Sequence, residues 1–588
     1  MSKENCKIIS RLMLIISILF QNNHAEILDA VVVGGGLSAL TTAYRLAQGG
    51  LNIELLDGDE NLGGRARSVI FNEKSFAAGG TFTLFENTFI LQLANEVGAL
   101  PIVPPVIPKE LAIIRIATNP YLLLKLWLIG YNMTLRDDYW NSENAIEYDT
   151  VSIEEWLQRE RRVFSWPEDA LQAVRDYYWL LESFDIKQTS WSALHGAVML
   201  HKRLRLLSAE GLYTKGFFRW ENGTGTLVNA IANGIRHLGG TISSSSRVIA
   251  INYTIPDQIK ITLANGQSKI AKKVVIATSL TSSGYIAYTP SLPTNPNYMK
   301  LFESNLYIDY VVIQLIMSWS KKWYLLQGNA ILPDPVQQPS CGVYGPVFDE
   351  TPANSVGGDL RILVVDTNRS YECLIQNQTS NLTVYDLIAK SAKDWFKSMY
   401  SVLGIPLGSY DIDSSFLQTN IWDWRTLKSL IPAPVYYYAP VANRIYWAGS
   451  ERSVNGLYWM EGAVQRGNDA ACEVLADFGL VPNCTEYSNW IEYLGLLARN
   501  TTYFQNLDKK YDSNLNIISL YACQILTQSG YACISQKQPW RQPINAIEQQ
   551  IKTLADGALI QLAEIDGLIK SAAVLIGDLI GLDFFKNK

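Results

Sequence analysis

Residues 28–39 read Leu-Asp-Ala-Val-Val-Val-Gly-Gly-Gly-Leu-Ser-Ala, and they establish the fold class. The apolar run 28–33 predicts a buried strand, and the apolar residues after the glycine turn recur at helical spacing. Gly49-Gly50 ends that helix, and 52–56 predicts a second strand. The chain therefore opens on a βαβ unit, which is typical of α/β proteins with a parallel sheet.

The glycine turn has the GxGxxA spacing of a phosphate-binding loop. Gly34 permits the tight turn, Gly36 lets a pyrophosphate approach the backbone, and Ala39 allows the helix to pack closely on the strand. Ser38 lies in the first helical turn, where free N–H groups and the helix dipole favour an anion. Asp57 lies 21 residues after Gly36, where an acid accepts bonds from ribose hydroxyls. The pattern predicts a dinucleotide site; the alternative is a glycine-rich turn without a ligand.

Composition excludes several other classes of protein. The chain has 588 residues, is 48% hydrophobic and 18% charged, and has a net charge of −6 (49 Lys and Arg against 55 Asp and Glu). Such a chain buries a large core, and without a basic block it is a poor candidate for binding nucleic acid. With four histidines and no HExxH or CxxC motif, we expect no metal site.

A second glycine motif, Gly63-Gly64-Arg65, follows Asp57. Its glycines bring backbone N–H groups close to a diphosphate, and the arginine supplies a cation. At this point the sequence resembles the flavin-containing amine oxidase family, which includes monoamine, polyamine and L-amino acid oxidases. The run 79–82 resembles the family's GG-containing turn beside the flavin ring.

The most specific resemblance lies near residue 450. The runs 445–451 (IYWAGSE) and 458–464 (YWMEGAV) resemble the family's C-terminal flavin motif, and their spacing matches without a gap. Two motifs nearly 400 residues apart and in the right order imply FAD rather than NAD. Beyond the first loop and Asp57, the resemblance assigns these residues to the cofactor site: Gly63, Gly64, Arg65, Gly80, Thr81, Val248, Trp422, Gly449, Ser450, Glu451, Trp459, Met460 and Ala463.

The catalytic residues that the resemblance implies depart from the family's pattern. Many members carry a lysine on a strand of the substrate domain, where it holds a water near the flavin. No lysine lies on the corresponding strand 311–318, and the alignment places Ile313 or Gln314 there, of which we prefer Gln314. Trp459 and Tyr458 replace the family's tyrosine and its preceding glycine, so we assign Gln314, Trp459 and Tyr458 to the catalytic site. The family's covalent attachment cysteine is also missing, since 422–427 occupies its place, and we expect noncovalent FAD.

The fold class implied by the resemblance is α/β. It is a two-domain fold of the FAD-dependent amine oxidase type, with a Rossmann-type FAD domain, a substrate domain of mixed sheet plus helices, and a helical C-terminal tail. We expect a leader at 1–25, the FAD domain at 26–85, 215–285 and 435–480, the substrate domain at 86–214 and 286–434, and a partly helical tail at 481–588.

The N-terminus reads as a secretory signal peptide, with basic residues before a short apolar run at 12–20. Six cysteines follow, compatible with disulfides of unknown connectivity. We expect Cys484, Cys523 and Cys533 to help fix the loops that precede the amphipathic stretch of the tail. Eight N-x-S/T sequons support a secreted, glycosylated protein. They begin at Asn132, Asn222, Asn252, Asn368, Asn377, Asn381, Asn483 and Asn500.

The tail from 544 to 580 has apolar residues at helical spacing, but charged residues interrupt it. It lacks the ~20 uncharged residues that a membrane span needs, so we expect no transmembrane anchor. We expect it instead to mediate self-association, giving a homo-oligomer, or to dock on the body of the protein.

The resemblance implies an FAD-dependent oxidoreductase that oxidises an amine to an imine, passes the electrons to O₂ and releases H₂O₂. No arginine follows the GG turn at 81–84, where L-amino acid oxidases commonly place one, so a small-molecule amine is the favoured substrate. Two alternatives stay open. One is another flavin reaction, such as desaturation or isomerisation of an apolar substrate. The other is an FAD-fold protein that has lost catalysis and serves as a binding or structural module.

Overall fold

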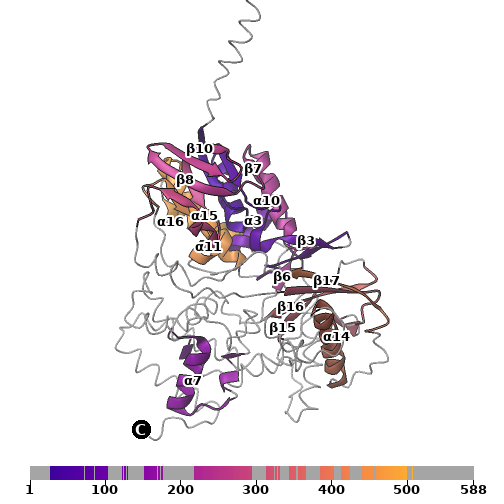
Figure 1. The fold of residues 1–588 in the computed structure, drawn as a ribbon. Coiled ribbons are helices and arrows are strands. Elements are labelled where there is room, and N and C mark those ends of the chain that lie inside the picture. The colour runs from indigo at the N-terminus through magenta and orange to yellow at the C-terminus, as the bar shows by residue number, and fades with distance from the viewer. Residues whose placement is uncertain are drawn as a thin grey trace, which may run out of the picture.

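The computed structural model describes most of the chain between residues 27 and 499 (Figure 1). The described ranges are 27–102, 151–175, 217–293, 313–330, 343–365, 384–402, 412–423, 440–453 and 459–499, less 72, 85–86, 169, 173, 324, 327–328, 352–354 and 482, together with the isolated residues 122, 125, 126, 129, 503 and 506. The leader, the segment 544–580 and Tyr458 lie outside these residues.

An eight-stranded sheet forms the body that carries the glycine loops. Its order is β11-β8-β9-β10-β1-β2-β7, with β18 also paired to β10. The pairs β7–β2, β2–β1, β1–β10 and β10–β18 are parallel, whereas β8–β9 and β9–β10 are antiparallel. The strands are β1 (Ile27–Val33), β2 (Ile53–Leu56), β7 (Thr241–Ser243), β8 (Val248–Ile255), β9 (Gln258–Leu263), β10 (Ser268–Ile276), β11 (Ala287–Thr289) and β18 (Ile445–Trp447).

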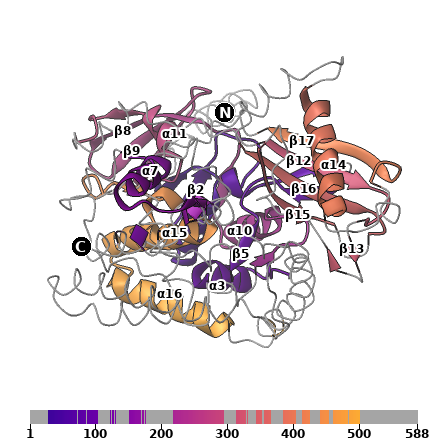
Figure 2. The same ribbon diagram turned by 90° about the horizontal axis from the view of Figure 1, so that it is seen from below.

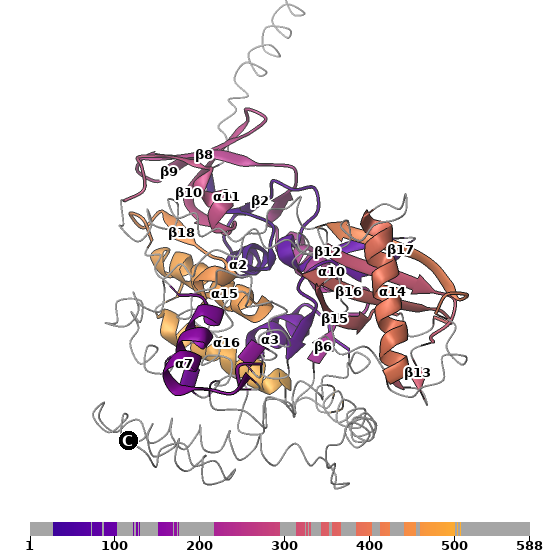
Figure 3. The ribbon, with the colours of Figure 1, turned by 60° about the horizontal axis from the view of Figure 1, so that its bottom comes forward.

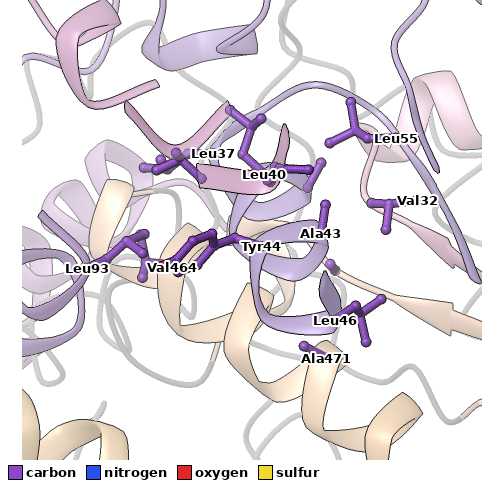
Figure 4. Packing of buried hydrophobic residues seen from close by; sticks show 14 of the residues in the cluster. Val32, Leu37, Leu40, Ala43, Tyr44, Leu46, Leu55, Leu93, Val464 and Ala471 are labelled. Atoms are coloured by element: carbon purple, nitrogen blue, oxygen red, sulfur yellow. The ribbon is translucent and has the colours of Figure 1, made fainter. Parts of the chain in front are cut away.

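Helices pack against one face of this sheet and form the main core (Figure 4). In Figure 4, helix α2 lies between the strand residues Val32 and Leu55 and the α15 residues Val464 and Ala471. Alternate strand residues, such as Val31 and Val33, turn to the other face and pack with β8 and β9. The helices of this body are α2 (Leu37–Gln48), α3 (Thr88–Glu96), α10 (Gly225–His237), α11 (Leu280–Gly284), α15 (Met460–Asp477) and α16 (Cys484–Arg499).

A separate four-stranded antiparallel sheet, β15-β16-β12-β17, lies beside this body (Figures 1 and 2). Helix α14 (Val384–Val402) crosses one face of it (Figure 3), where Phe396 contacts Trp319 and Trp323. The other face is turned toward the large sheet and its loops, because Ile316 packs with Phe76 and Ala78. The strands are β12 (Ile313–Trp319), β15 (Val343–Asp349), β16 (Gly358–Val365) and β17 (Phe416–Asp423).

Shorter elements complete the described chain. They are η1 (Gly64–Ala66), β3 (Ser68–Phe71), β4 (Lys74–Ala77), β5 (Phe82–Leu84), β6 (Phe217–Arg219), α7 (Ile153–Phe164), β13 (Leu325–Leu326), β14 (Asn329–Ala330) and η5 (Ser450–Arg452). In helix α7, Ser152 and Glu155 form a reciprocal capping box, which explains why the helix begins at Ile153.

The α/β fold class is confirmed, and the opening βαβ unit has the predicted order, with strand bounds shifted by one residue. Cys484 begins helix α16 and is bonded to Cys472 on α15, so this disulfide spans the connection between the two helices. The sequence could not reveal this pairing, because six cysteines permit 15 connectivities. The exact domain bounds stay predictions.

Candidate functional site

The first glycine loop leaves open space in front of the N-terminus of α2. Gly34 has φ +120°, and a Cβ atom there would lie 2.9 Å from the Ala277 carbonyl oxygen, so a side chain does not fit. A Cβ at Gly36 would meet nothing within 4 Å. Gly36 is also the N-cap of α2 and no side chain caps the helix, so this helix end is suited to an anion. Ser38 and Ala39, both buried, lie in its first turn.

The second glycine motif packs directly on the first. The Gly63 N–H donates to the Gly35 carbonyl at 2.7 Å, and a Cβ at Gly64 would lie 3.2 Å from the Gly36 Cα. Arg65 extends from this motif, and its Nη2 donates to Ser450 Oγ at 3.1 Å. The two loops therefore form one cradle, with a guanidinium beside it.

The C-terminal motif joins this cradle through backbone and hydroxyl groups. The Gly449 N–H donates to Ser38 Oγ at 2.9 Å, although the two residues are 411 positions apart. Gly449 has φ +127°, and Ser450 is buried beside it. Open space at Gly36, an uncapped helix end and a nearby guanidinium fit the pyrophosphate of a dinucleotide.

Asp57 lies where β2 ends, close to the first loop. A Cβ at Gly35 would meet its carboxylate at 1.9 Å, so only glycine leaves room for this acid. Burial, with a further contribution from the negative charge of Asp59, raises the pKa of Asp57 to about 6. Its carboxylate accepts the Asp59 N–H at 3.3 Å and is positioned to accept ribose hydroxyls. Val248 lies behind it in the core cluster that also contains Leu56.

Asp59 lies two residues after Asp57, and it pairs with Arg67 at 2.7 Å. Burial acts to raise the pKa of Asp59, but the hydrogen bond and charge of Arg67 outweigh it and lower the pKa. The ion pair with Arg67 therefore keeps Asp59 ionised.

Helix α15 begins at Met460, with Trp459 as its N-cap, and Ala463 N donates to the Trp459 carbonyl. A Cβ at Gly80 would lie 3.0 Å from the Met460 side chain, so the GG turn and the start of α15 are in contact. Glu461 has a role that the motif did not reveal. Its two carboxylate oxygens accept the N–H groups of Phe89 and Ile90 at 3.0 and 2.9 Å, which caps helix α3.

Gln314 lies on the face of β12 that is turned toward the large sheet. Side chains alternate along a strand, so Gln314 shares a face with Ile316, which packs with Phe76 and Ala78. Gln314 is 2% exposed, and its Oε1 has no hydrogen-bond partner among the residues that the structure describes. A buried acceptor without a partner is costly and indicates a ligand or water site.

The remaining predicted residues are placed only in part. Trp422 lies on β17 directly opposite Gln314, and Glu451 lies on η5, but their side chains are outside the described residues. Thr81 is buried after the GG turn, where its hydroxyl donates to the Gly79 carbonyl and accepts from Arg361. Arg361 belongs to no motif, and sequence reasoning missed it.

Two absences concern the described residues alone. Within those ranges no cluster of three or more His, Cys, Asp and Glu side chains could hold a metal ion. No helix in the described part of the chain is long and apolar enough to cross a membrane.

The fold and the site define a flavin-dependent oxidoreductase. Residues 37–475 match the family described as flavin containing amine oxidoreductase, and the chain belongs to this family. It is therefore an FAD enzyme, with its cofactor held noncovalently.

Individual relatives agree with this assignment. The chain is 22% identical to the flavin-containing amine oxidase B of Homo sapiens over 530 residues, which cover 86% of this chain and 97% of the relative. Among solved structures, a putrescine oxidase variant superposes with a TM-score of 0.57 at 16% identity, over 76% of this chain and 99% of that one. Cyclohexylamine oxidase from Brevibacterium oxydans superposes with a TM-score of 0.56 at 17% identity, over 77% of this chain and 99% of that one.

Asp57 should make FAD binding depend on pH. Ribose hydroxyls donate to the ionised carboxylate, so the affinity of the apoprotein for FAD should fall about tenfold for each pH unit below 6. Titrations of apoprotein with FAD between pH 5 and 8, followed by flavin fluorescence, would measure this.

Asp57→Asn should bind more weakly at pH 7 and lose the dependence. Because the raised pKa favours the protonated apoprotein, the stability contributed by Asp57 is present below its unfolded pKa of 3.8 and is lost as the pH rises through 6. The apo variant should therefore be more stable than wild type at pH 7. In Asp59→Asn, the loss of the neighbouring negative charge should lower the pKa of Asp57, so the fall in FAD affinity should begin at a lower pH than in wild type. An equal pH dependence in wild type and Asp57→Asn would contradict the role of Asp57.

Proposed function

We propose that this enzyme oxidises a small-molecule amine to an imine, with O₂ as acceptor and H₂O₂ as product. The observation that carries the proposal is the unpartnered Oε1 of buried Gln314, on the sheet face that is turned toward the cofactor loops. The family supports the amine oxidoreductase class, and the solved structures that the chain resembles include a putrescine oxidase variant and a cyclohexylamine oxidase.

Bound FAD would supply the two-electron oxidation, taking a hydride from the carbon next to the amine. Gly34, Gly36, Arg65 and Ser450 would hold the pyrophosphate, and Asp57 the ribose. The contact between Gly80 and Met460 would shape the surface beside the ring system. The α15 N-terminus offers a positive dipole end toward negative charge that develops there.

Gln314 would accept a hydrogen bond from a water or from the substrate nitrogen and so orient it. The amide is neutral, so it orients without adding charge. Trp459, which is partly buried at the start of α15, would present a ring face that guides the neutral amine. Ile316, Phe76 and Ala78 would exclude bulk water on the adjoining side.

An amine fits better than an amino acid. The turn 79–82 is followed by Thr83 and Leu84, so this segment offers no cation to a substrate carboxylate. The side chains that are described on the Gln314 face of β12 are an amide, an isoleucine and a serine. A neutral, apolar amine is therefore the favoured substrate class.

Gln314→Leu should slow anaerobic reduction of the bound flavin by an amine about tenfold, because one oriented hydrogen bond is lost. Stopped-flow absorption with a panel of primary amines would measure the rate, and peroxide release would follow turnover in air. Gln418→Leu is a matched control, because it makes the same substitution on the adjacent strand β17, opposite Ser318 and four residues along the sheet from Gln314.

A yellow wild-type protein that no amine or amino acid reduces would exclude the oxidase. The alternative function to test would then be a flavin reaction with an apolar substrate that lacks nitrogen. A colourless protein that cannot be reconstituted with FAD would point to a binding or structural role.

We also propose that the protein is secreted and N-glycosylated. Three sequon asparagines lie in the described residues (Asn222, Asn252 and Asn483), and each is exposed. The Cys472–Cys484 disulfide suits an oxidising compartment. Expression in a eukaryotic secretory host should give protein in the medium that loses mass on endoglycosidase treatment. Intracellular protein with an intact N-terminus and no glycan would contradict the proposal.

We propose that the tail supports self-association or docks on the body. Helix α16, at the start of the predicted tail 481–588, exposes Trp490, Tyr493 and Leu497, at 56, 50 and 47%. Beside this surface is a cavity of about 570 Å³ between α16 and the helices α2 and α3. These apolar side chains offer a surface for a helical segment.

Removal of residues 540–588 should lower the sedimenting mass or the unfolding temperature and leave the FAD content unchanged. Analytical ultracentrifugation and thermal unfolding would measure both. Unchanged mass and stability would contradict this role, and full-length protein that sediments with membranes would favour an anchor.

A further inference from the structure

Three buried ionic side chains meet between the two sheets: Arg219 on β6, Glu350 after β15, and Arg361 on β16. Arg219 Nη1 lies 3.0 Å from Glu350 Oε2, and Arg361 Nε lies 2.9 Å from Glu350 Oε1. Their side chains are 5, 2 and 1% exposed, respectively for Arg219, Glu350 and Arg361. Burial of such charges is costly, so the cluster is weak evidence for stability by itself. Its geometry points to another role.

Arg361 also reaches the turn that the cofactor assignment places beside the flavin. Its Nη2 donates to Thr81 Oγ1 at 2.7 Å. The Thr81 hydroxyl donates in turn to the Gly79 carbonyl at 2.8 Å, and Thr224 Oγ1 donates to the Gly80 carbonyl at 2.5 Å. Polar contacts therefore fix every residue of the turn 79–81, which packs on Met460.

The same arginine belongs to the strand pair that carries Gln314. Arg361 lies directly opposite Ile316 on β12, so both side chains are on one face of the sheet. Gln314 lies two residues along that face. The guanidinium of Arg361 thus connects the strand pair β12–β16, which carries Gln314, to the GG turn.

We propose that Arg361 is a positioning residue: through Thr81 it sets the GG turn, and with it the flavin edge, at a fixed place relative to Gln314. The proposal rests on the proposed function of Gln314. An arginine suits this role because its planar fork directs Nε to Glu350 and Nη2 to Thr81 at once, which a lysine ammonium cannot do in this geometry.

A second connection lies on the same sheet face. Lys74 on β4 lies 2.7 Å from Asp359, which also accepts from Ser318 Oγ at 2.7 Å. The Lys74 side chain is 41% exposed, so solvent weakens this pair. The buried Arg361–Thr81 contact is therefore the stiffer of these two connections between β16 and the segment 74–81.

The test removes only the hydroxyl that Arg361 contacts. Thr81→Val keeps the side-chain shape and leaves the Arg219–Glu350–Arg361 cluster intact, and Thr81→Ser keeps the hydroxyl. Thr83→Val is the matched control: Thr83 is equally buried on β5, but its hydroxyl accepts from Asn87. Visible circular dichroism of bound FAD reports the flavin's surroundings without turnover, and anaerobic stopped flow gives the rate constant of flavin reduction.

In Thr81→Val the visible dichroism should change, and the reduction rate constant should fall about tenfold with the half-saturating amine concentration nearly unchanged, because the misplacement affects orientation rather than binding. Thr81→Ser should resemble wild type, and so should Thr83→Val. Arg361→Lys should lower the rate as much as Thr81→Val, and the double variant no further, because the two residues act as one unit.

The proposal is wrong if Thr81→Val and Thr83→Val have the same dichroism and rate, or if the Arg361 and Thr81 effects add. If wild type is not reduced by any amine, the oxidase proposal fails. The dichroism comparison then still decides whether the Arg361–Thr81 contact fixes the flavin's surroundings.

Discussion

The hydrogen bond from the Gly449 N–H to Ser38 Oγ joins the two ends of the cofactor site, and the rest of the site depends on it. The parallel pairing of β18 with β10 brings residues 445–447 into the sheet that begins with β1. Helix α15 then crosses α2 at Gly467, where a Cβ would lie 2.7 Å from the Ser38 carbonyl. Glycine is required at this crossing, because a side chain would separate the helices and move the α15 N-terminus away from the cradle.

Local motifs predict the candidate cofactor site. The strand, turn, helix and acid of the first βαβ unit lie within about 30 residues, so spacing alone indicates their arrangement. Gln314 was harder, since a strand pattern gives two alternating faces but not which face meets the cofactor loops. That assignment required the packing of Ile316 on Phe76 and Ala78.

Other residues could not be found from sequence. Glu461 caps α3 across 371 and 372 positions, and Arg361 reaches Thr81 across 280. Arg361 belongs to no motif, and the motif that contains Glu461 does not indicate its contact with α3, because both partners are set by tertiary packing. The Cys472–Cys484 bond spans only 12 residues, yet six cysteines left its partner open.

If Gln314 stands at the position of the family's lysine, as the resemblance implies, its neutral side chain and the placement of Arg361 follow from the same constraint. A buried ammonium at Gln314 would lose its hydration, and its pKa would fall. A neutral amide at 2% exposure avoids that cost and still offers an acceptor. The sheet instead carries its buried cation two residues along the same face, at Arg361, where Glu350 pairs with it. The sheet therefore separates orientation, proposed for the amide of Gln314, from buried charge, which lies at Arg361 beside the carboxylate of Glu350.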